Sequence, residues 1–223
     1  MKKLLRISLR LLGLLILLLF AVILWSGGKG YYDALADSGA LAERADRLIE
    51  DGRGGTSLGE SQLAILIKVQ DPGFGNHKGV DLTTPGAGLT TITQSLSKRL
   101  AFETFQPGFA KIRQTGYALG LEARLGKQQI LALWLATVPM GEGPDGWITG
   151  FHAASQAIYD RAPPELDRDE FLRLVAVLIA PGAYDLSGAD TKLDDRVSRI
   201  EKLIAGECRP TGLNDVWLEA CGN

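Results

Sequence analysis

The sequence predicts a mainly α-helical protein with an N-terminal transmembrane helix. Residues 11–25 form an uninterrupted apolar run, and most of the later chain carries apolar residues at helical spacing. Alternation of apolar and polar residues, the pattern typical of half-buried strands, is scarce. The chain has 223 residues, which is enough for one domain with a substantial core and an appendage.

The apolar run is interpreted as an uncleaved membrane anchor. A membrane span needs about 17–25 residues, and the long stems of Arg6 and Arg10 allow this one to begin near Leu4 or Ile7. A cleaved secretory signal is the alternative, but no Ala-x-Ala site follows the run. Basic residues at positions 2, 3, 6 and 10 precede the span, which predicts a cytoplasmic N-terminus and a domain on the outer side.

The chain after the span is acidic. The formal net charge is −2 and the four basic residues before the span contribute +4, so the remainder sums to −2 − 4 = −6. A domain of this charge lacks the basic surface of a nucleic-acid-binding protein, and we exclude nucleic acid as a partner.

Four parts are expected along the chain. Residues 1–28 are the cytoplasmic tip and anchor, 29–56 a juxtamembrane helical segment, 57–189 the main domain, and 190–223 a C-terminal helix and tail. Glycines predict a short flexible exit from the membrane at residues 26–29, and Ser38-Gly39 is expected to interrupt the juxtamembrane helix.

Helical spacing and terminal signals place the remaining elements. Asp167 and Glu170 resemble a capping box, and Pro181-Gly182 ends the helix that they begin. The prolines and glycines of residues 139–146 predict a tight loop. The expected helices cover residues 31–50, 57–69, 90–100, 109–125, 127–138, 148–159, 167–180 and 190–205.

The only two cysteines, Cys208 and Cys221, lie in the C-terminal tail. In an oxidising exported compartment they would form a disulfide that holds an otherwise loose end. Two buried free thiols are the alternative. Because the domain is placed outside the membrane, we expect the disulfide.

Residues 68–98 combine three features that together indicate a site. They hold a glycine-rich turn at residues 85–88, a threonine-rich helix start, and a cluster of polar side chains: Gln70, Asp71, Asn76, His77 and Asp81. Glycines let backbone N–H groups approach a ligand closely. An ordinary surface loop followed by a capped helix is the alternative.

Ordered motifs from residue 63 to residue 186 extend this cluster. The first comprises Gln70, Asp71, Phe74, His77, Gly79 and Asp81, and the second Gly88, Thr90, Thr91, Ile92, Thr93, Gln94, Leu96 and Lys98. The others comprise Lys111, Arg113 and Gln114, then Leu121, Glu122, Lys127, Ile130 and Leu131, and finally Gly141, Gly143 and Gly146. Their order and spacing resemble the family-51 peptidoglycan glycosyltransferases, whose lysozyme-like domain polymerises lipid II into glycan strands.

The chain departs from that family at the positions of its catalytic residues. Gln70 and Gln114 stand at the positions of the family's two essential glutamates. An amide cannot accept a proton near neutral pH, and general acid–base assistance is typically worth about 10²- to 10⁴-fold in rate. The stretch between the first two motifs is also shortened to Leu82–Leu89. Asp71 and Asp81 are the first candidates for a relocated base, ahead of Glu103, Glu122 and Glu142.

The retained motif residues suggest binding. The resemblance implies that Lys98, Lys111 and Arg113 bind diphosphate oxygens, helped by the helix N-terminus near Thr90. It implies that Thr91, Thr93 and Gln94 hydrogen-bond sugar or phosphate, and that His77 has a structural role near the site. We expect no protein metal site, with Mg²⁺ or Mn²⁺ required only if the protein is active.

Two functions follow from this resemblance. The first is a bacterial cytoplasmic-membrane protein with a single span that binds lipid II or glycan strands, or accompanies a cell-wall synthase, with impaired or absent polymerase activity. The second is an active, atypical glycosyltransferase that uses Asp71 or Asp81 as its base. Lysozyme-like cleavage of glycan is disfavoured because the same two glutamines replace the acids that it would need.

Overall fold

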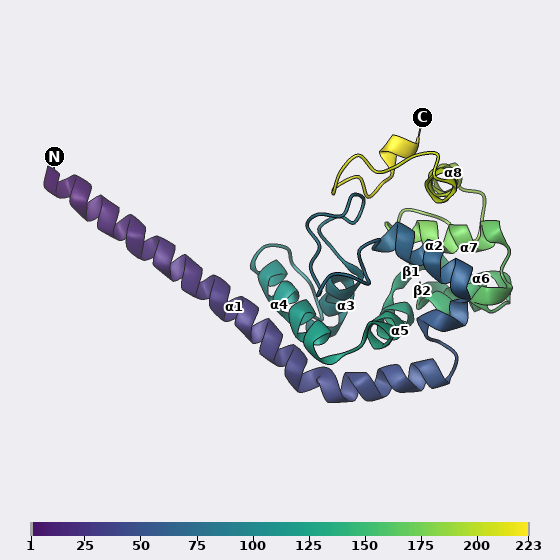
Figure 1. Cartoon of the computed structure of the whole chain (residues 1–223), viewed down its shortest axis with the longest axis horizontal. Coiled ribbons are helices and arrows are strands. Elements are labelled where there is room, and N and C mark those ends of the chain that lie inside the picture. The colour runs from purple at the N-terminus through teal and green to yellow at the C-terminus, as the bar shows by residue number, and fades with distance from the viewer. Residues whose placement is uncertain (1, 223) are drawn as a thin grey trace.

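The chain begins with one very long helix, α1 (Lys2–Glu50), whose first half projects away from the body of the molecule (Figure 1). The structure is a computed structural model, which describes residues 2–222, with side chains described from Ile7 onward. Side chains from Ile7 to Trp25 are all exposed. Within the described residues, α1 is the one helix that is long and apolar enough to cross a membrane.

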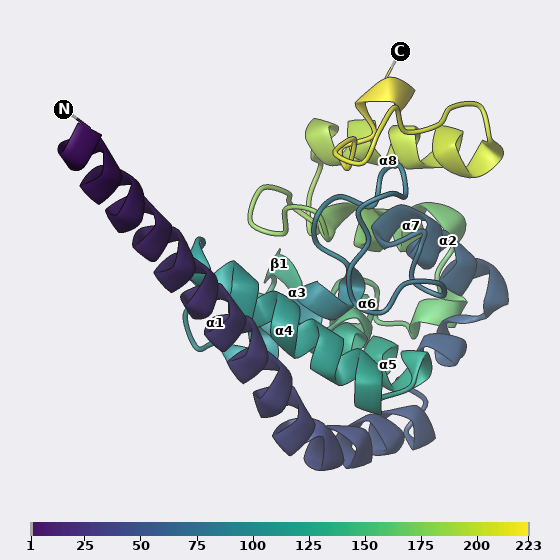
Figure 2. The same ribbon diagram turned by 60° about the vertical axis from the view of Figure 1, so that its left-hand side comes forward.

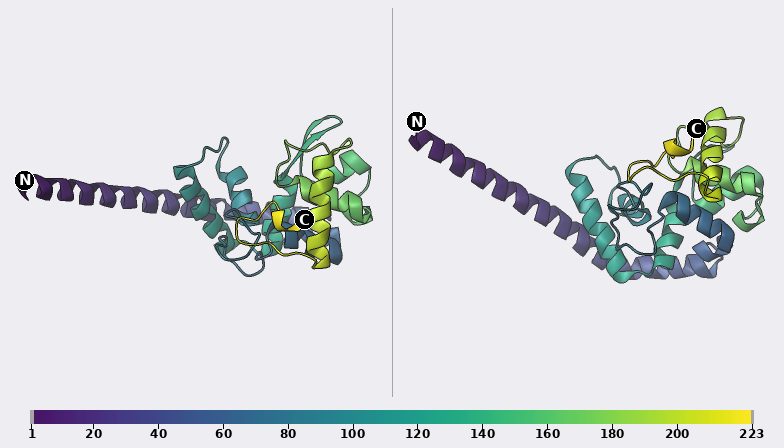
Figure 3. Two further views of the ribbon diagram at one scale, coloured as in Figure 1. Left: turned by 90° about the horizontal axis from the view of Figure 1, so that it is seen from above. Right: turned by 45° about the horizontal axis from the view of Figure 1, so that its top comes forward.

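The expected flexible exit and the expected interruption of the juxtamembrane helix are both wrong, because α1 is helical without a break. A glycine inside a helix costs about 1 kcal/mol relative to alanine. Here that cost is offset by close packing of α1 on α4 (Phe109–Arg124), which lies beside it in every view (Figures 2 and 3). A Cβ atom on Gly30 would lie 2.9 Å from the backbone nitrogen of Tyr117. At Ser38 the helix continues, and the Ser38 hydroxyl donates to the carbonyl oxygen of Leu35 at 2.8 Å.

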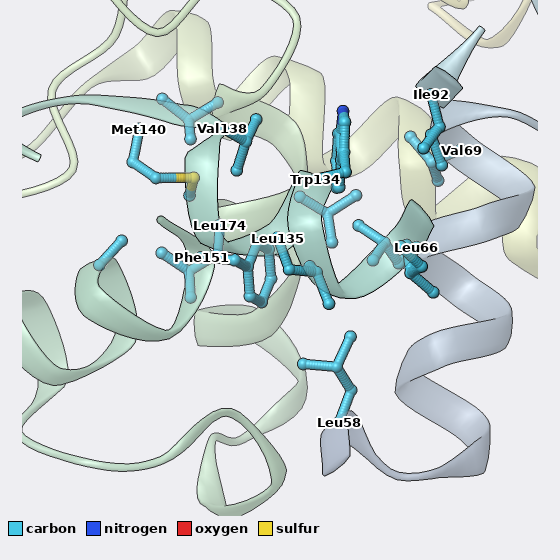
Figure 4. Close-up of a cluster of buried hydrophobic side chains, with 14 of the residues drawn as sticks. Leu58, Leu66, Val69, Ile92, Trp134, Leu135, Val138, Met140, Phe151 and Leu174 are labelled. Atoms are coloured by element: carbon cyan, nitrogen blue, oxygen red, sulfur yellow. The ribbon is translucent and has the colours of Figure 1, made fainter. Parts of the chain in front are cut away.

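The body is mainly helical and is built around α5 (Lys127–Thr137), in which every residue from Ile130 to Leu135 is buried. Its surroundings include α2 (Glu60–Gln70), α3 (Ile92–Ala101), α6 (Phe151–Tyr159) and α7 (Arg168–Val177). Figure 4 shows Leu66 and Val69 of α2, Ile92 of α3, Phe151 of α6 and Leu174 of α7 gathered around Trp134 and Leu135. Three short 3-10 turns complete the helical elements: η1 (Gly55–Leu58), η2 (Pro163–Glu165) and η3 (Glu219–Cys221).

The starts of α7 and α8 (Thr191–Ala205) agree within one residue with those expected from the sequence. Asp167 and Asp190 cap these two helices: their side chains accept hydrogen bonds from the nitrogens of Glu170 and Lys192, both at 2.9 Å. The segment expected as a helix over 57–69 is divided at Gly59, whose φ of 87° lies in the region that favours glycine. The end expected at residue 180 comes earlier, since α7 stops at Val177.

The tight loop expected at residues 139–146 is instead a β-hairpin. Strand β1 (Pro139–Gly143) pairs antiparallel with β2 (Gly146–Thr149), and helix α6 therefore begins at Phe151 instead of 148. The register shifts between Pro139 and Gly141. Gly141 has a φ of 99° and lies against the carbonyl oxygen of Pro181, so a side chain could not be accommodated there.

The C-terminal segment packs on the main domain. Leu193, Val197 and Ile200 of α8 belong to the common core. The expected disulfide between Cys208 and Cys221 is present. The tail that it closes reaches the glycine-rich turn, where Gly86 and Gly88 donate to the carbonyl oxygens of Gly212 and Leu213 at 2.9 and 2.8 Å.

Candidate functional site

A cavity of about 440 Å³ lies between the end of α2, the turn at residues 86–91, helices α3 and α5, and the C-terminal segment. Its polar wall includes Gln70, Thr91, Ser95, Lys98, Arg99 and Arg196. No aspartate or glutamate lines it within the described part of the chain. A cavity of this size falls within the range of small-molecule sites, which measure about 300–1,000 Å³.

Among the candidate catalytic and substrate-binding side chains, Gln70, Thr91 and Lys98 line this cavity. The others lie in its surroundings, as described below. The glycine-rich turn also borders the cavity, but the hypothesis that its N–H groups are free for a ligand is wrong for two of them. The nitrogens of Gly86 and Gly88 are already bonded to the C-terminal tail.

Gln70, the last residue of α2, uses its amide as a donor. Its Nε2 donates to the carbonyl oxygen of Val175 at 3.0 Å. That carbonyl lies in the last turn of α7, where helix carbonyls have no partner within the helix. Because a carbonyl oxygen only accepts, this bond requires a donor, which the amide supplies and an ionised glutamate lacks.

Gln114 of α4 is buried and makes the same kind of bond. Its Nε2 donates to the carbonyl oxygen of Gln94 at 2.6 Å, while its Oε1 is buried without a partner. The side chain of Gln94 donates in turn to Thr115 at 3.2 Å. Gln70 and Gln114 therefore both donate their amides to backbone carbonyls, and neither is arranged as a proton acceptor.

Asp71 is fully buried and connects three parts of the structure. Its Oδ1 and Oδ2 lie 3.0 and 2.9 Å from Nε2 of His77, and Oδ2 also accepts from the backbone nitrogen of Ile92 at 2.9 Å. The latter bond satisfies an N–H group in the first turn of α3. Asp71 and His77 thus fix the loop after α2 to the start of α3, away from the cavity lining.

Asp81 stabilises a turn. Its Oδ1 accepts from the nitrogens of Thr83 and Thr84 at 2.9 and 3.0 Å, and from the Thr83 hydroxyl at 3.2 Å. Burial alone would raise the pKa of this carboxyl, but the hydrogen bonds from Thr84 and Thr83 lower it to about 2. A carboxylate with so low a pKa is a weak base near neutral pH.

Thr93 and Glu122 belong to a second interior network. The Thr93 hydroxyl donates to Oε1 of Glu122 at 2.6 Å, and Nζ of Lys127 donates to the same oxygen at 2.7 Å. Lys127 also donates to the carbonyl oxygen of His77 at 2.9 Å and lies over the ring of Phe74. These residues hold α3, α4 and α5 to the loop, and Glu122 is committed to an ion pair.

Of the three predicted diphosphate-binding cations, Lys98 and Lys111 lie near each other, and Arg113 does not join them. Lys98 lines the cavity with its Nζ 5.0 Å from the centre of the Phe105 ring. Lys111 donates to Thr90 at 3.1 Å, and burial together with the charge of nearby Lys98 lowers its pKa. Arg113 points toward α1, where its Nη2 lies 2.8 Å from Oδ2 of Asp33. Arg113 is therefore directed away from the cavity.

Sequence reasoning missed Arg99 and Arg196, which both line the cavity. Arg99 follows Lys98 at a position where the family motif has asparagine, and this departure was the available signal. Arg196 lies outside every motif, so only the packing of α8 brings it to the site.

A divalent cation does not fit this cavity. Mg²⁺ and Mn²⁺ prefer oxygen ligands that include carboxylates, whereas the lining offers neutral oxygens beside Lys98, Arg99 and Arg196. Over residues 2–222, no three His, Cys, Asp or Glu side chains gather as a metal site would require.

Comparison with known proteins identifies one family model and several related proteins. The transglycosylase family model matches residues 82–205, more than half of the chain. The match begins after Asp81, so the first motif lies outside it, and it extends through α8.

Several curated relatives are similar over part of their length. A biosynthetic peptidoglycan transglycosylase of Marinomonas sp. is 31% identical over 152 residues, covering 63% of this chain and 65% of the relative. One from Alcanivorax borkumensis is 28% identical over 185 residues, covering 76% and 74%. Penicillin-binding protein 1B of Escherichia coli is 29% identical over 133 residues, which is only 16% of its own length.

Proposed function

The chain belongs to the transglycosylase family, and from this premise we propose that it is a membrane-anchored protein of cell-wall assembly that binds lipid II or glycan strands without polymerising them efficiently. The observation that carries the proposal is the absence of any Asp or Glu among the described residues that line the cavity. A general base must lie within about 2.6–3.2 Å of the proton that it removes, or one water away.

The hydrogen bonds of the two glutamines support the proposed loss of polymerase activity. Each donates its amide to a backbone carbonyl, at 3.0 Å for Gln70 and 2.6 Å for Gln114. A glutamate at either position would lose that hydrogen bond and place a charged oxygen near a carbonyl oxygen. The surroundings therefore favour the amide over the carboxylate.

The alternative, an active enzyme with a relocated base, gains no support from the two carboxylates proposed for it. Asp71 is buried between His77 and the start of α3. The pKa of Asp81 is lowered to about 2, with burial opposing and hydrogen bonds from Thr84 and Thr83 producing the shift. Neither side chain lines the cavity.

The anchor sets where such binding would take place. The exposed apolar half of α1 is long enough to span a bilayer, and the basic residues before it favour a cytoplasmic N-terminus. The body would then lie at the outer face of the membrane, where lipid-linked sugars are presented beside it. A neighbouring cell-wall synthase is a further candidate partner.

The test uses the full chain in detergent or nanodiscs with lipid II and Mg²⁺ or Mn²⁺. We expect the native protein to bind lipid II and to form little or no glycan polymer. Efficient polymerisation by the native protein would overturn the proposal, and loss of that activity in Asp71→Asn or Asp81→Asn would identify the base. If lipid II does not bind at all, the search moves to protein partners.

A Gln70→Glu, Gln114→Glu double variant tests whether only the carboxylates are missing. Because both amides donate to carbonyls, we expect the double variant to be less stable than the native protein and to recover little polymerase activity. Gln106→Glu, at an exposed loop position, is the matched control for adding a carboxylate. Strong polymerisation by the double variant would show that the cavity can still bind and position the substrate.

A further inference from the structure

The C-terminal tail, residues 208–221, supplies part of the cavity wall. Val216 of this tail lines the cavity together with the glycine-rich turn. The tail, yellow in Figure 1, reaches the loop that precedes α3, where the nitrogens of Gly86 and Gly88 donate to two tail carbonyls at 2.9 and 2.8 Å. Two segments that are far apart in the sequence therefore share one wall.

The contact between the turn and the tail leaves no room for a ligand to pass. A Cβ atom on Gly86 would lie 2.8 Å from Cγ of Pro210, and one on Gly88 would lie 2.6 Å from Cγ1 of Val216. Both glycines have positive φ values, 79° and 67°, at which a side chain would be strained. A space that cannot accept a methyl group cannot accept a sugar ring, so the cavity does not continue between these two segments.

Helix α8 holds the tail from its other side. Nη2 of Arg196 donates to the carbonyl oxygen of Val216 at 2.9 Å, and Nη1 of Arg199 donates to that of Trp217 at 3.3 Å. Hydrogen bonds from a charged donor are stronger than those between neutral groups. The tail is therefore fixed on two sides, by the turn and by α8.

The tail is also ordered internally. The carboxylate of Asp215 accepts from the backbone nitrogens of Thr211 and Glu219 at 3.1 and 2.8 Å. The disulfide joins Cys208 to Cys221, which is 1% exposed and belongs to the core. A chain end is usually poorly ordered unless it is tied down. These bonds tie this end down, so the wall exists before any ligand binds.

We propose that the tail determines which ligands the cavity admits: one lipid-linked sugar unit enters, and a glycan strand is excluded. A strand needs a groove that continues beyond the first bound unit, whereas the junction of turn and tail closes the cavity on this side. The resemblance implies that the stretch between the first two motifs is shortened to Leu82–Leu89, and the tail packs on what remains of it. The inference rests on the proposed function and deepens it, because it selects one of the two ligand classes named there.

Thiol labelling of the full chain in detergent measures access to the cavity without any natural ligand. Ser95 lines the cavity, and Ser95→Cys places a single free thiol there, since the two native cysteines are joined. The small reagent is methyl methanethiosulfonate, and the large one is a maleimide linked to dextran. Ser61→Cys, at an exposed position of α2 outside the lining, is the control for the intrinsic rate of each reagent.

A release variant frees the tail by combining Cys208→Ser, Asp215→Ala and Cys221→Ser, which removes the disulfide and the internal hydrogen bonds. We expect the small reagent to label Ser95→Cys at similar rates with the tail held or released. The large reagent should label it at least about tenfold faster after release, while the Ser61→Cys rate stays the same. An unchanged rate of large-reagent labelling at Ser95→Cys would overturn the inference.

Binding measurements test the selectivity itself. The probes are lipid II in detergent and purified glycan strands, and the native protein should prefer lipid II by at least about tenfold. That preference should shrink in the release variant and in Val216→Ala, which removes only the side chain that lines the cavity. Trp217→Ala is the matched control, because Trp217 is the next residue, is 41% exposed and lies outside the lining.

The two readouts keep the proposals distinct. Equal binding of lipid II and glycan strands by the native protein, or a preference unchanged in both tail variants, would overturn the inference and leave the proposed function standing. Absence of binding to either probe would overturn the proposed function. In that case faster large-reagent labelling after release would still show that the tail controls access to the cavity.

Discussion

Gly116 of α4 lies directly against Gly27 of α1, so that a Cβ atom on Gly116 would overlap the carbonyl oxygen of Gly27. Gly120 repeats the contact one turn later, where a Cβ atom would lie 2.6 Å from the carbonyl oxygen of Tyr31. Glycines at helix interfaces let two backbones approach closely. This contact fixes the direction in which the projecting part of α1 leaves the body (Figure 1).

Substitution of Gly116 by valine should therefore separate α1 from α4. Overpacking of a tight interface typically costs about 1–3 kcal/mol, and we expect a loss of stability of that size in thermal unfolding of the detergent-purified protein. Gly39→Ala is the control, because no atom lies within 4 Å of the added Cβ. Equal stability of the two variants would contradict close packing at Gly116.

Asp71→Asn should behave as a structural substitution. The asparagine would lose the charge that faces His77 and weaken the bond to the nitrogen of Ile92, so we expect about 1–3 kcal/mol of lost stability. Chemical denaturation measures the effect, and Glu103→Gln, at an exposed loop position, is the control. Native stability of Asp71→Asn would instead favour a functional role for this carboxylate.

His152 should make stability depend on pH. Burial, together with the charge of Arg53, lowers its pKa from 6.5 to about 4, and its Nε2 lies 3.1 Å from the Ser57 hydroxyl. Between pH 6.5 and about 4 the unfolded state takes up a proton that the folded state does not. The stabilising effect of neutral His152 is therefore complete above pH 6.5 and decreases as the pH falls toward 4.

The free energy of unfolding measured against pH checks this prediction. The native protein should lose stability over that window more steeply than His152→Gln, which cannot titrate. Since other groups titrate equally in both proteins, the difference between the two curves reports His152. Parallel curves would rule out the shifted histidine.

Reduction of the disulfide should loosen the C-terminal segment. Cys208 and Cys221 are 13 residues apart, and a bridge across a loop of this size contributes about 3 kcal/mol. The Cys208→Ser, Cys221→Ser variant should unfold at a lower temperature, and hydrogen exchange should increase at Gly86 and Gly88, whose N–H groups bond to the tail. Unchanged protection at these two glycines would show that the tail holds its place without the bridge.

Several features could be predicted from the sequence because their causes are local. The apolar run, the capping aspartates Asp167 and Asp190, and the helical spacing of the later segments act within a few residues. The resemblance implies that Gln70 and Gln114 stand at the family's two glutamate positions, and this stays a prediction. The expected flexible exit at residues 26–29 is wrong because the cost of a glycine in a helix is local, whereas the compensating contact of Gly27 with Gly116 comes from α4.

The tertiary structure alone decided which polar residues share a space. Motif spacing grouped Arg113 with Lys98. In the structure Arg113 instead donates to Asp33 of α1, which lies 80 residues earlier in the chain. Motif spacing also grouped Asp71 with catalysis, whereas the structure buries Asp71 between His77 and the start of α3. Arg196 reaches the cavity only because α8 packs on the core, and no local pattern records such a contact. Local signals therefore determined the helices and the family, while long-range packing determined the chemistry of the cavity.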